Sequence, residues 1–171
     1  LDTSTVSLSA LKMNLDDSLE LYADVIRNPA FPSADFDRVK KLQQAGIQRE
    51  KAEPNALANR ILPGLIYGAN HPYGQPFSGS GTEASLAKIT RDSIANFYST
   101  WYKPNNATLF IVGDTTLDEI KPKLEKLLGD WKTGEVPKKN IAQVPHREKT
   151  TVYLIDRPGA VQSVIMAGQV A

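Results

Sequence analysis

The spacing of apolar residues changes along the chain, and over residues 33–53 it is helical. Apolar side chains recur there every three or four positions: Phe36, Val39, Leu42 and Ile47. A repeat near 3.6 residues places such side chains on one face of a helix. Ser33 follows a proline, and its hydroxyl can accept a hydrogen bond from a free backbone N–H at a helix start. The pattern therefore predicts one long amphipathic helix that ends before Pro54.

Gly46 lies in the interior of this predicted helix. A glycine at an interior position destabilises a helix by about 1 kcal/mol relative to alanine. Such a glycine commonly marks a place where a neighbouring backbone packs closely. We therefore expect another segment of the chain to approach the helix at Gly46.

Further helices are predicted by apolar periodicity and by capping residues. They cover residues 14–27, 55–67, 82–87, 90–101 and 117–128. Thr116 and Glu119 have the spacing of a capping box at the start of the last helix. Pro63 removes a backbone hydrogen bond and is expected to kink or break the 55–67 helix. The aromatic residues of the 90–101 helix follow one face, which predicts that they are buried in a core.

Several other segments have the pattern of β-strands. Polar and apolar residues alternate over 5–11, residues 107–112 form a short apolar run, and 150–155 and 161–167 flank a Pro-Gly turn. Strands and helices mixed in this order predict an α+β fold. We expect an antiparallel or mixed β-sheet with helices packed on one face.

Length, charge and composition exclude some functions. The chain has 171 residues, of which 41% are apolar, enough for one domain or slightly more. The net charge is +1 and there is no long basic run, which gives nucleic-acid binding little electrostatic support. No apolar run approaches the roughly 18–20 residues of a membrane span. The absence of cysteine excludes disulfides and thiolate chemistry. The chain begins without methionine and ends inside a predicted strand, so we expect it to be part of a longer protein.

Histidines offer few candidates for catalysis or metal binding. The chain has two of them, His71 in the loop 68–81 and His146 in the polar stretch 132–149. No HxxxH, HxxEH or HExxH spacing occurs, so one helix cannot present two imidazoles to a zinc ion. A lone histidine lacks the partners of a catalytic set, and we expect His71 to order its loop.

Other candidate residues are equally isolated. The glycines of the loop 68–81 follow no predicted strand and lack the context of a phosphate-binding loop. No GxSxG motif is present. Glu50 and Glu53 can share a helix face, and we expect both carboxylates to be solvated.

The order of these elements resembles a known family. The stretch LDDSLELYADVIRNPAFPSADFDRVKKLQQAGIQREKAEPNALANRILPGLIYGANHPYG resembles the segment that follows the zinc motif in the pitrilysin/insulinase peptidases, the inverzincins. Residues 89–114 are similar to that family's capped helix, aromatic residue, Tyr-x-Pro-x-Asn motif, strand and Gly-Asp pair. The stretch DRPGAVQSVIMAG resembles its entry into the next α/β domain. The resemblance covers nearly the whole chain and is greatest to bacterial members related to mitochondrial processing peptidase.

The resemblance implies a domain organisation. Residues 1–131 correspond to the later part of an inverzincin-like peptidase domain of LuxS/processing-peptidase type. Residues 132–149 form a linker. Residues 150–171 either start the next domain or return as strands to the same sheet.

The family's chemistry then points to Gly46. In the family, the two histidines of an HxxEH helix bind zinc and the glutamate of that motif acts as the base. A glutamate of a later helix is the third zinc ligand. That glutamate precedes the position matching Ile47, which is Gly46 here. Glycine has no ligating side chain, so the resemblance implies a non-catalytic domain with no catalytic or metal-binding residue, and zinc only in an active partner domain. Glu50, one helical turn or about 5.4 Å further along, is a weak fallback ligand.

The resemblance also implies a role and partners. Inactive domains of the family enclose peptide substrates together with an active domain or subunit, and bacterial relatives suggest a periplasmic location. One alternative is a fragment of a catalytically active zinc endopeptidase whose HxxEH motif lies upstream. Another is a structural scaffold, like the peptidase-derived core subunits of respiratory complexes.

Overall fold

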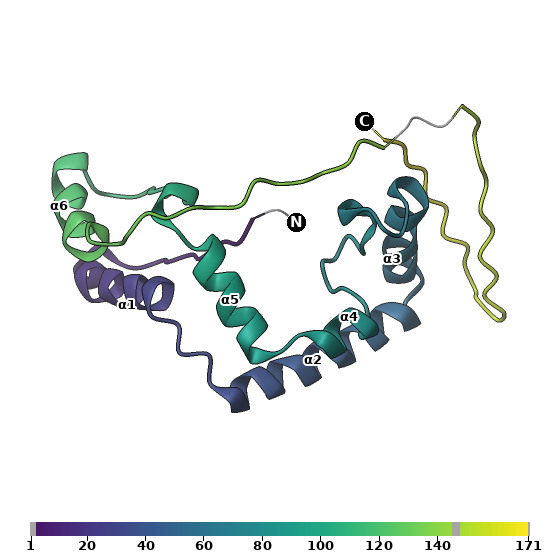
Figure 1. The fold of residues 1–171 in the computed structure, drawn as a ribbon, viewed down its shortest axis with the longest axis horizontal. Helices are drawn as coiled ribbons and strands as arrows, with labels where there is room; N and C mark the ends of the chain where they lie inside the picture. The colour runs from purple at the N-terminus through teal and green to yellow at the C-terminus, as the bar shows by residue number, and fades with distance from the viewer. Residues whose placement is uncertain (1–2, 145–147, 171) are drawn as a thin grey trace. The chain divides into compact units, whose positions relative to one another are not determined.

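The structure, a computed structural model, describes residues 3–144 and 148–170. Within these residues the secondary structure is entirely helical (Figure 1). The α-helices are α1 (Leu15–Arg27), α2 (Ser33–Ala52), α3 (Pro54–Tyr67), α4 (Glu83–Lys88), α5 (Arg91–Trp101) and α6 (Leu117–Leu128). Three short 3-10 helices are also present in these residues: η1 (Lys12–Asn14) directly precedes α1, η2 (Pro72–Gly74) lies between α3 and α4, and η3 (Pro104–Asn106) lies between α5 and α6.

The predicted α+β fold is wrong, because no strand or sheet is present in the described part of the chain. The segments expected to be strands, 5–11, 107–112, 150–155 and 161–167, are irregular. A strand exists only where a neighbour supplies a ladder of backbone hydrogen bonds, and an alternating pattern cannot supply that neighbour. Several of their apolar side chains are almost fully exposed to solvent: Val112 is 99% exposed, Leu154 94% and Ile165 93%.

The predicted helices are present, with ends close to those expected. Thr90 accepts a hydrogen bond from Ser93 N at 3.1 Å and caps α5, and Thr116 accepts one from Glu119 N at 3.3 Å and caps α6. The Glu119 carboxylate accepts a hydrogen bond from the Thr115 hydroxyl at 3.3 Å. α3 continues through the fully buried Pro63, so the proline does not break this helix.

The chain forms two compact units. Of the described residues, unit 1 contains 37–88, 139–144 and 148–170, and unit 2 contains 3–36 and 89–138. Most of α2, all of α3 and α4, and η2 therefore belong to unit 1. α1, α5 and α6 belong to unit 2.

Unit 2 is organised by contacts at helix ends. Leu19 and Ala23 of α1 and Ile120 of α6 are its buried apolar residues. The Arg27 guanidinium donates to Leu127 O at the end of α6, at 2.5 Å. The Tyr98 hydroxyl lies 2.7 Å from Ile26 O, and so closes the end of α1.

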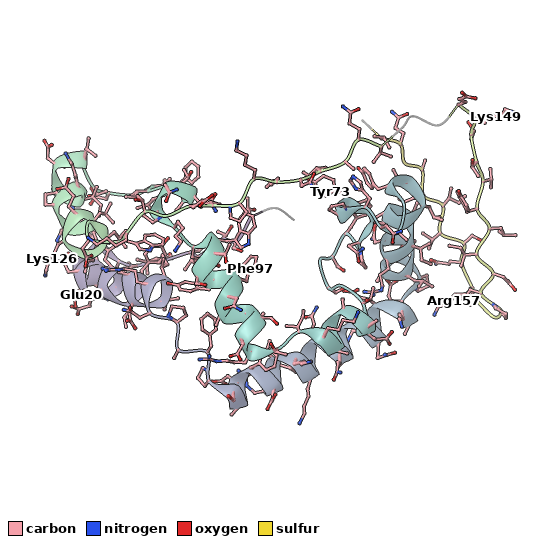
Figure 2. All side chains as sticks on the ribbon, in the orientation of Figure 1. Glu20, Tyr73, Phe97, Lys126, Lys149 and Arg157 are labelled. Carbon is pink, nitrogen blue, oxygen red and sulfur yellow. The ribbon has the colours of Figure 1, made fainter. Side chains whose placement is uncertain are left out.

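The aromatic face of α5 is less covered than its periodicity predicts. Phe97 is 51% exposed and Ile94 37% exposed, and Phe97 projects from the helix (Figure 2). Tyr98 and Trp101 are half-buried. The prediction that this face is core is therefore wrong for Phe97, because spacing fixes which residues share a face and not what covers it.

Unit 1 is built around Ile47, which has no exposed surface, and Pro63. Leu86 of α4 is also buried. Polar side chains of α2 hold α4 from outside this core: Gln48 and Lys51 both donate to the Glu83 carboxylate. These hydrogen bonds lower the pKa of Glu83.

Candidate functional site

Gly46 lies in the middle of α2 with open space beside it. Apart from its two chain neighbours and the backbone of its own helix, a Cβ built on this glycine would meet no atom within 4 Å. The expectation that a neighbouring segment packs closely against Gly46 is therefore wrong. The adjacent Ile47 provides the buried contact of this turn. The position of Gly46 has room for a side chain but offers no atom that could bind a metal.

Glu50, one turn after Gly46, is engaged by three side chains. Its Oε2 accepts hydrogen bonds from Arg60 Nη1 at 2.5 Å, Ser80 Oγ at 2.7 Å and Ser78 Oγ at 3.2 Å. The exposed fraction of the side chain is 24% for Glu50 and 8% for Arg60. The expectation that this carboxylate is solvated is wrong, because the loop 78–81 and α3 cover it.

Electrostatics at Glu50 favour the ionised carboxylate. Burial raises the pKa of Glu50, but hydrogen bonds from Ser80, Arg60 and Ser78, together with the Arg60 charge, outweigh burial and lower that pKa below its ordinary value. Arg60 also donates to Ser80 Oγ at 2.6 Å and to Gly81 O at 2.7 Å. The cluster of Glu50, Arg60, Ser78 and Ser80, which we call the Glu50 cluster, fixes the loop 78–81 on α2 and α3.

Glu53 has a different task from Glu50. Its carboxylate accepts hydrogen bonds from Asn55 N at 3.2 Å and Ala56 N at 2.6 Å. Glu53 is thus the N-cap of α3, where a negative charge also suits the helix dipole. Glu50 and Glu53, which the sequence predicts on one helix face, therefore stabilise different parts of the structure.

The residues of this site do not fit a zinc ion. Zinc in proteins takes three or four ligands from histidine, cysteine and carboxylates. Gly46 offers none, and the Glu50 carboxylate is paired with a guanidinium whose charge repels a cation. Within residues 3–144 and 148–170, no three His, Cys, Asp or Glu side chains form a group able to hold a metal.

His71 orders its loop, as predicted. Its Nδ1 accepts a hydrogen bond from Tyr73 N at 3.1 Å and so caps η2. The imidazole is stacked on Tyr67, with ring centroids 5.6 Å apart. Its Nε2 lies 2.9 Å from Ala142 O. His146, the other histidine, lies outside the described residues.

The partners of Glu50 could not be found from the sequence. Arg60 is ten residues away and Ser80 thirty, and no motif links these positions. Only the local signal, a carboxylate one turn after an interior glycine, was visible.

No helix in the described ranges is long and apolar enough to cross a membrane.

Comparison with known proteins gives consistent matches. Residues 88–170 match the family described as "Peptidase M16 inactive domain", and Gly46 and Glu50 precede this region. The chain is 25% identical over 146 residues to the "Uncharacterized zinc protease YmfH" of Bacillus subtilis, covering 85% of this chain and 33% of that protein. It is 27% identical over 157 residues to the "Probable zinc protease PqqL" of Haemophilus influenzae, covering 90% of this chain and 15% of that protein.

A solved structure is also similar. The crystal structure of a peptidase M16 inactive domain from Pseudomonas fluorescens superposes with a TM-score of 0.68 at 26% sequence identity. The match covers 82% of this chain and 33% of that one. The chain thus spans a third or less of the length of these relatives.

Proposed function

We propose that the chain is an inactive domain of the pitrilysin/insulinase (M16) peptidase family, that it pairs with an active peptidase domain, and that it helps to enclose peptide substrates. It supplies no catalytic group and no zinc ligand. Zinc belongs only to the active partner.

The observation that carries the proposal is the state of α2. Gly46 stands where active relatives are expected to have a ligating glutamate, and no other side chain fills the space beside it. Glu50, the nearest replacement, is held by Arg60 and two serine hydroxyls. Because the donor set does not fit a metal, no reaction step is assigned to this chain.

Exposed apolar side chains support the pairing. In unit 2, Phe110 is 85% exposed, and in unit 1, Val152 is 88% exposed and Val161 98%. Phe110 and Val152 each lie in a run of exposed apolar residues, 109–112 in unit 2 and 152–155 in unit 1, and exposed apolar patches commonly mark a surface that another protein covers. Such surfaces suit a domain that works inside a larger assembly.

The metal assignment is tested by elemental analysis of the protein as its gene encodes it. We expect Glu50→Gln to leave its zinc content unchanged, because this carboxylate binds Arg60 and not a metal. Glu53→Gln is the matched control, since it removes a carboxylate from the same turn. Stoichiometric zinc that is lost on Glu50→Gln and kept on Glu53→Gln would overturn the assignment.

The role is tested with a quenched fluorescent peptide. The chain alone should leave the peptide intact, and adding it to an active M16 domain should both form a complex in a pull-down and raise the cleavage rate. Cleavage by the chain alone would favour the alternative of a catalytic fragment. A stable complex with an unchanged cleavage rate would favour the alternative of a structural scaffold.

A further inference from the structure

Both ring nitrogens of His71 are used, and their partners fix the tautomer. Tyr73 N can only donate a hydrogen bond, so Nδ1, at 3.1 Å from it, must be without a proton. Nε2 then carries the proton of the neutral ring and donates to Ala142 O at 2.9 Å. One imidazole therefore joins η2 to the 139–144 segment, both within unit 1.

Two tyrosine rings lie beside the half-buried imidazole, and the segments around it supply no carboxylate that would stabilise a positive charge. Tyr67 of α3 is stacked on it with an interplanar angle of 17°, and Tyr73 of η2, labelled in Figure 2, lies tilted at a centroid distance of 5.7 Å. α3, the loop 68–81 and residues 139–144 contain no aspartate or glutamate. Their charged side chains are Arg60, which binds Glu50, and Lys139.

A second proton is incompatible with this arrangement. On Nδ1 it would turn the acceptor into a donor that faces the N–H of Tyr73, so the cap of η2 is lost. The ring must then rotate away from Tyr73 N, and rotation moves Nε2 off Ala142 O. Histidine is the side chain whose protonation falls in the mildly acidic range.

We propose that His71 is a pH-sensitive clasp that fixes the 139–144 segment against α3 and η2 when neutral and releases it when protonated. The clasp does not depend on the pairing or on the enclosure of peptides. It controls how firmly residues 139–144 are held against α3 and η2.

A spin label tests the clasp in the complete chain. The chain has no cysteine, so Asn140→Cys provides a single labelling position on an exposed residue of the segment. We expect a slow, restricted spectrum at about pH 8 and a mobile one at about pH 5. The label should be mobile at both pH values in His71→Ala, and His146→Ala should behave like the parent chain.

A further variant separates release from unfolding. In His71→Asn, the side-chain oxygen can still cap η2 but does not titrate and does not extend to Ala142. The label should then be mobile at both pH values while amide exchange at Tyr73 stays slow. A pH-independent label in the chain with His71 intact, a transition that persists in His71→Ala, or one that disappears in His146→Ala refutes the clasp.

Discussion

Replacing Gly46 by alanine should stabilise α2. The residue lies well inside the 20-residue helix Ser33–Ala52, and an added Cβ would meet no atom within 4 Å other than those of its chain neighbours and its own helix backbone. No repacking is therefore required, and only the difference in helix propensity remains. That difference is about 0.8–1 kcal/mol in favour of alanine. For a chain of this size it corresponds to a rise in melting temperature of roughly 2–4 °C.

The assay must report on unit 1. Both tryptophans, Trp101 and Trp131, lie in unit 2, so their fluorescence follows the other unit. Amide hydrogen exchange of α2 measures the opening free energy of the helix directly. We expect this free energy to rise by about 1 kcal/mol in Gly46→Ala while the tryptophan transition in urea stays in place.

A neighbouring substitution serves as the matched control. Ala45 is exposed and precedes Gly46 in the same helix, so Ala45→Gly should lower the opening free energy by about the same amount. If Gly46→Ala instead lowers the stability of α2, a group must approach this glycine closely. The reasoning that its position is open would then be refuted.

Further predictions concern contacts between side chains and backbone. Arg60→Ala leaves Glu50 without its cation and should destabilise unit 1 by about 1–3 kcal/mol in amide-exchange measurements. Because the pKa of Glu50 is lowered in the folded chain, the stability that the Glu50 cluster contributes is present above about pH 4.3 and is lost as the pH falls further. Tyr98→Phe should lower the free energy of unfolding of unit 2 by about 1 kcal/mol, measured by tryptophan fluorescence. Because burial raises the pKa of Tyr98, the stability contributed by its hydroxyl is lost as the pH rises above about 10. Asn105→Ala removes both hydrogen bonds to the backbone of Gly134, at 2.9 and 3.1 Å, and should cost about 1–2 kcal/mol in the same assay, whereas Asn105→Asp keeps the acceptor and should lose less.

Helices were predictable because their signals are local. The hydroxyls of Thr90 and Thr116 accept hydrogen bonds from residues three positions later, so a short window of sequence contains both partners. The same holds for the helical spacing of apolar residues. The Tyr-x-Pro-x-Asn motif also has a local meaning, since Asn106 Nδ2 donates to Trp101 O at the end of α5.

The absence of strands could not be predicted from the sequence, because a strand forms only when a second segment pairs with it. Residues 107–112 have the composition of a buried strand, yet Phe110 and Val112 are exposed and no ladder forms in the described residues. The same limit applies to the Glu50 cluster. Its donors come from α3 and from the loop 78–81, and neither spacing nor composition links them to Glu50.

The two observations on α2 strengthen each other. An open glycine alone could mean that one ligand has been lost while a nearby carboxylate takes its place. Glu50 is that carboxylate, and it is committed to Arg60 and to two serine hydroxyls that also fix the loop 78–81. Restoring a glutamate by Gly46→Glu would place a like charge one turn from Glu50, at a cost of a few tenths of a kcal/mol that the nearby guanidinium can offset. The fold should therefore tolerate Gly46→Glu, and Glu50 would stay paired with Arg60, so any metal that this variant gained would be bound through the new carboxylate and not through Glu50.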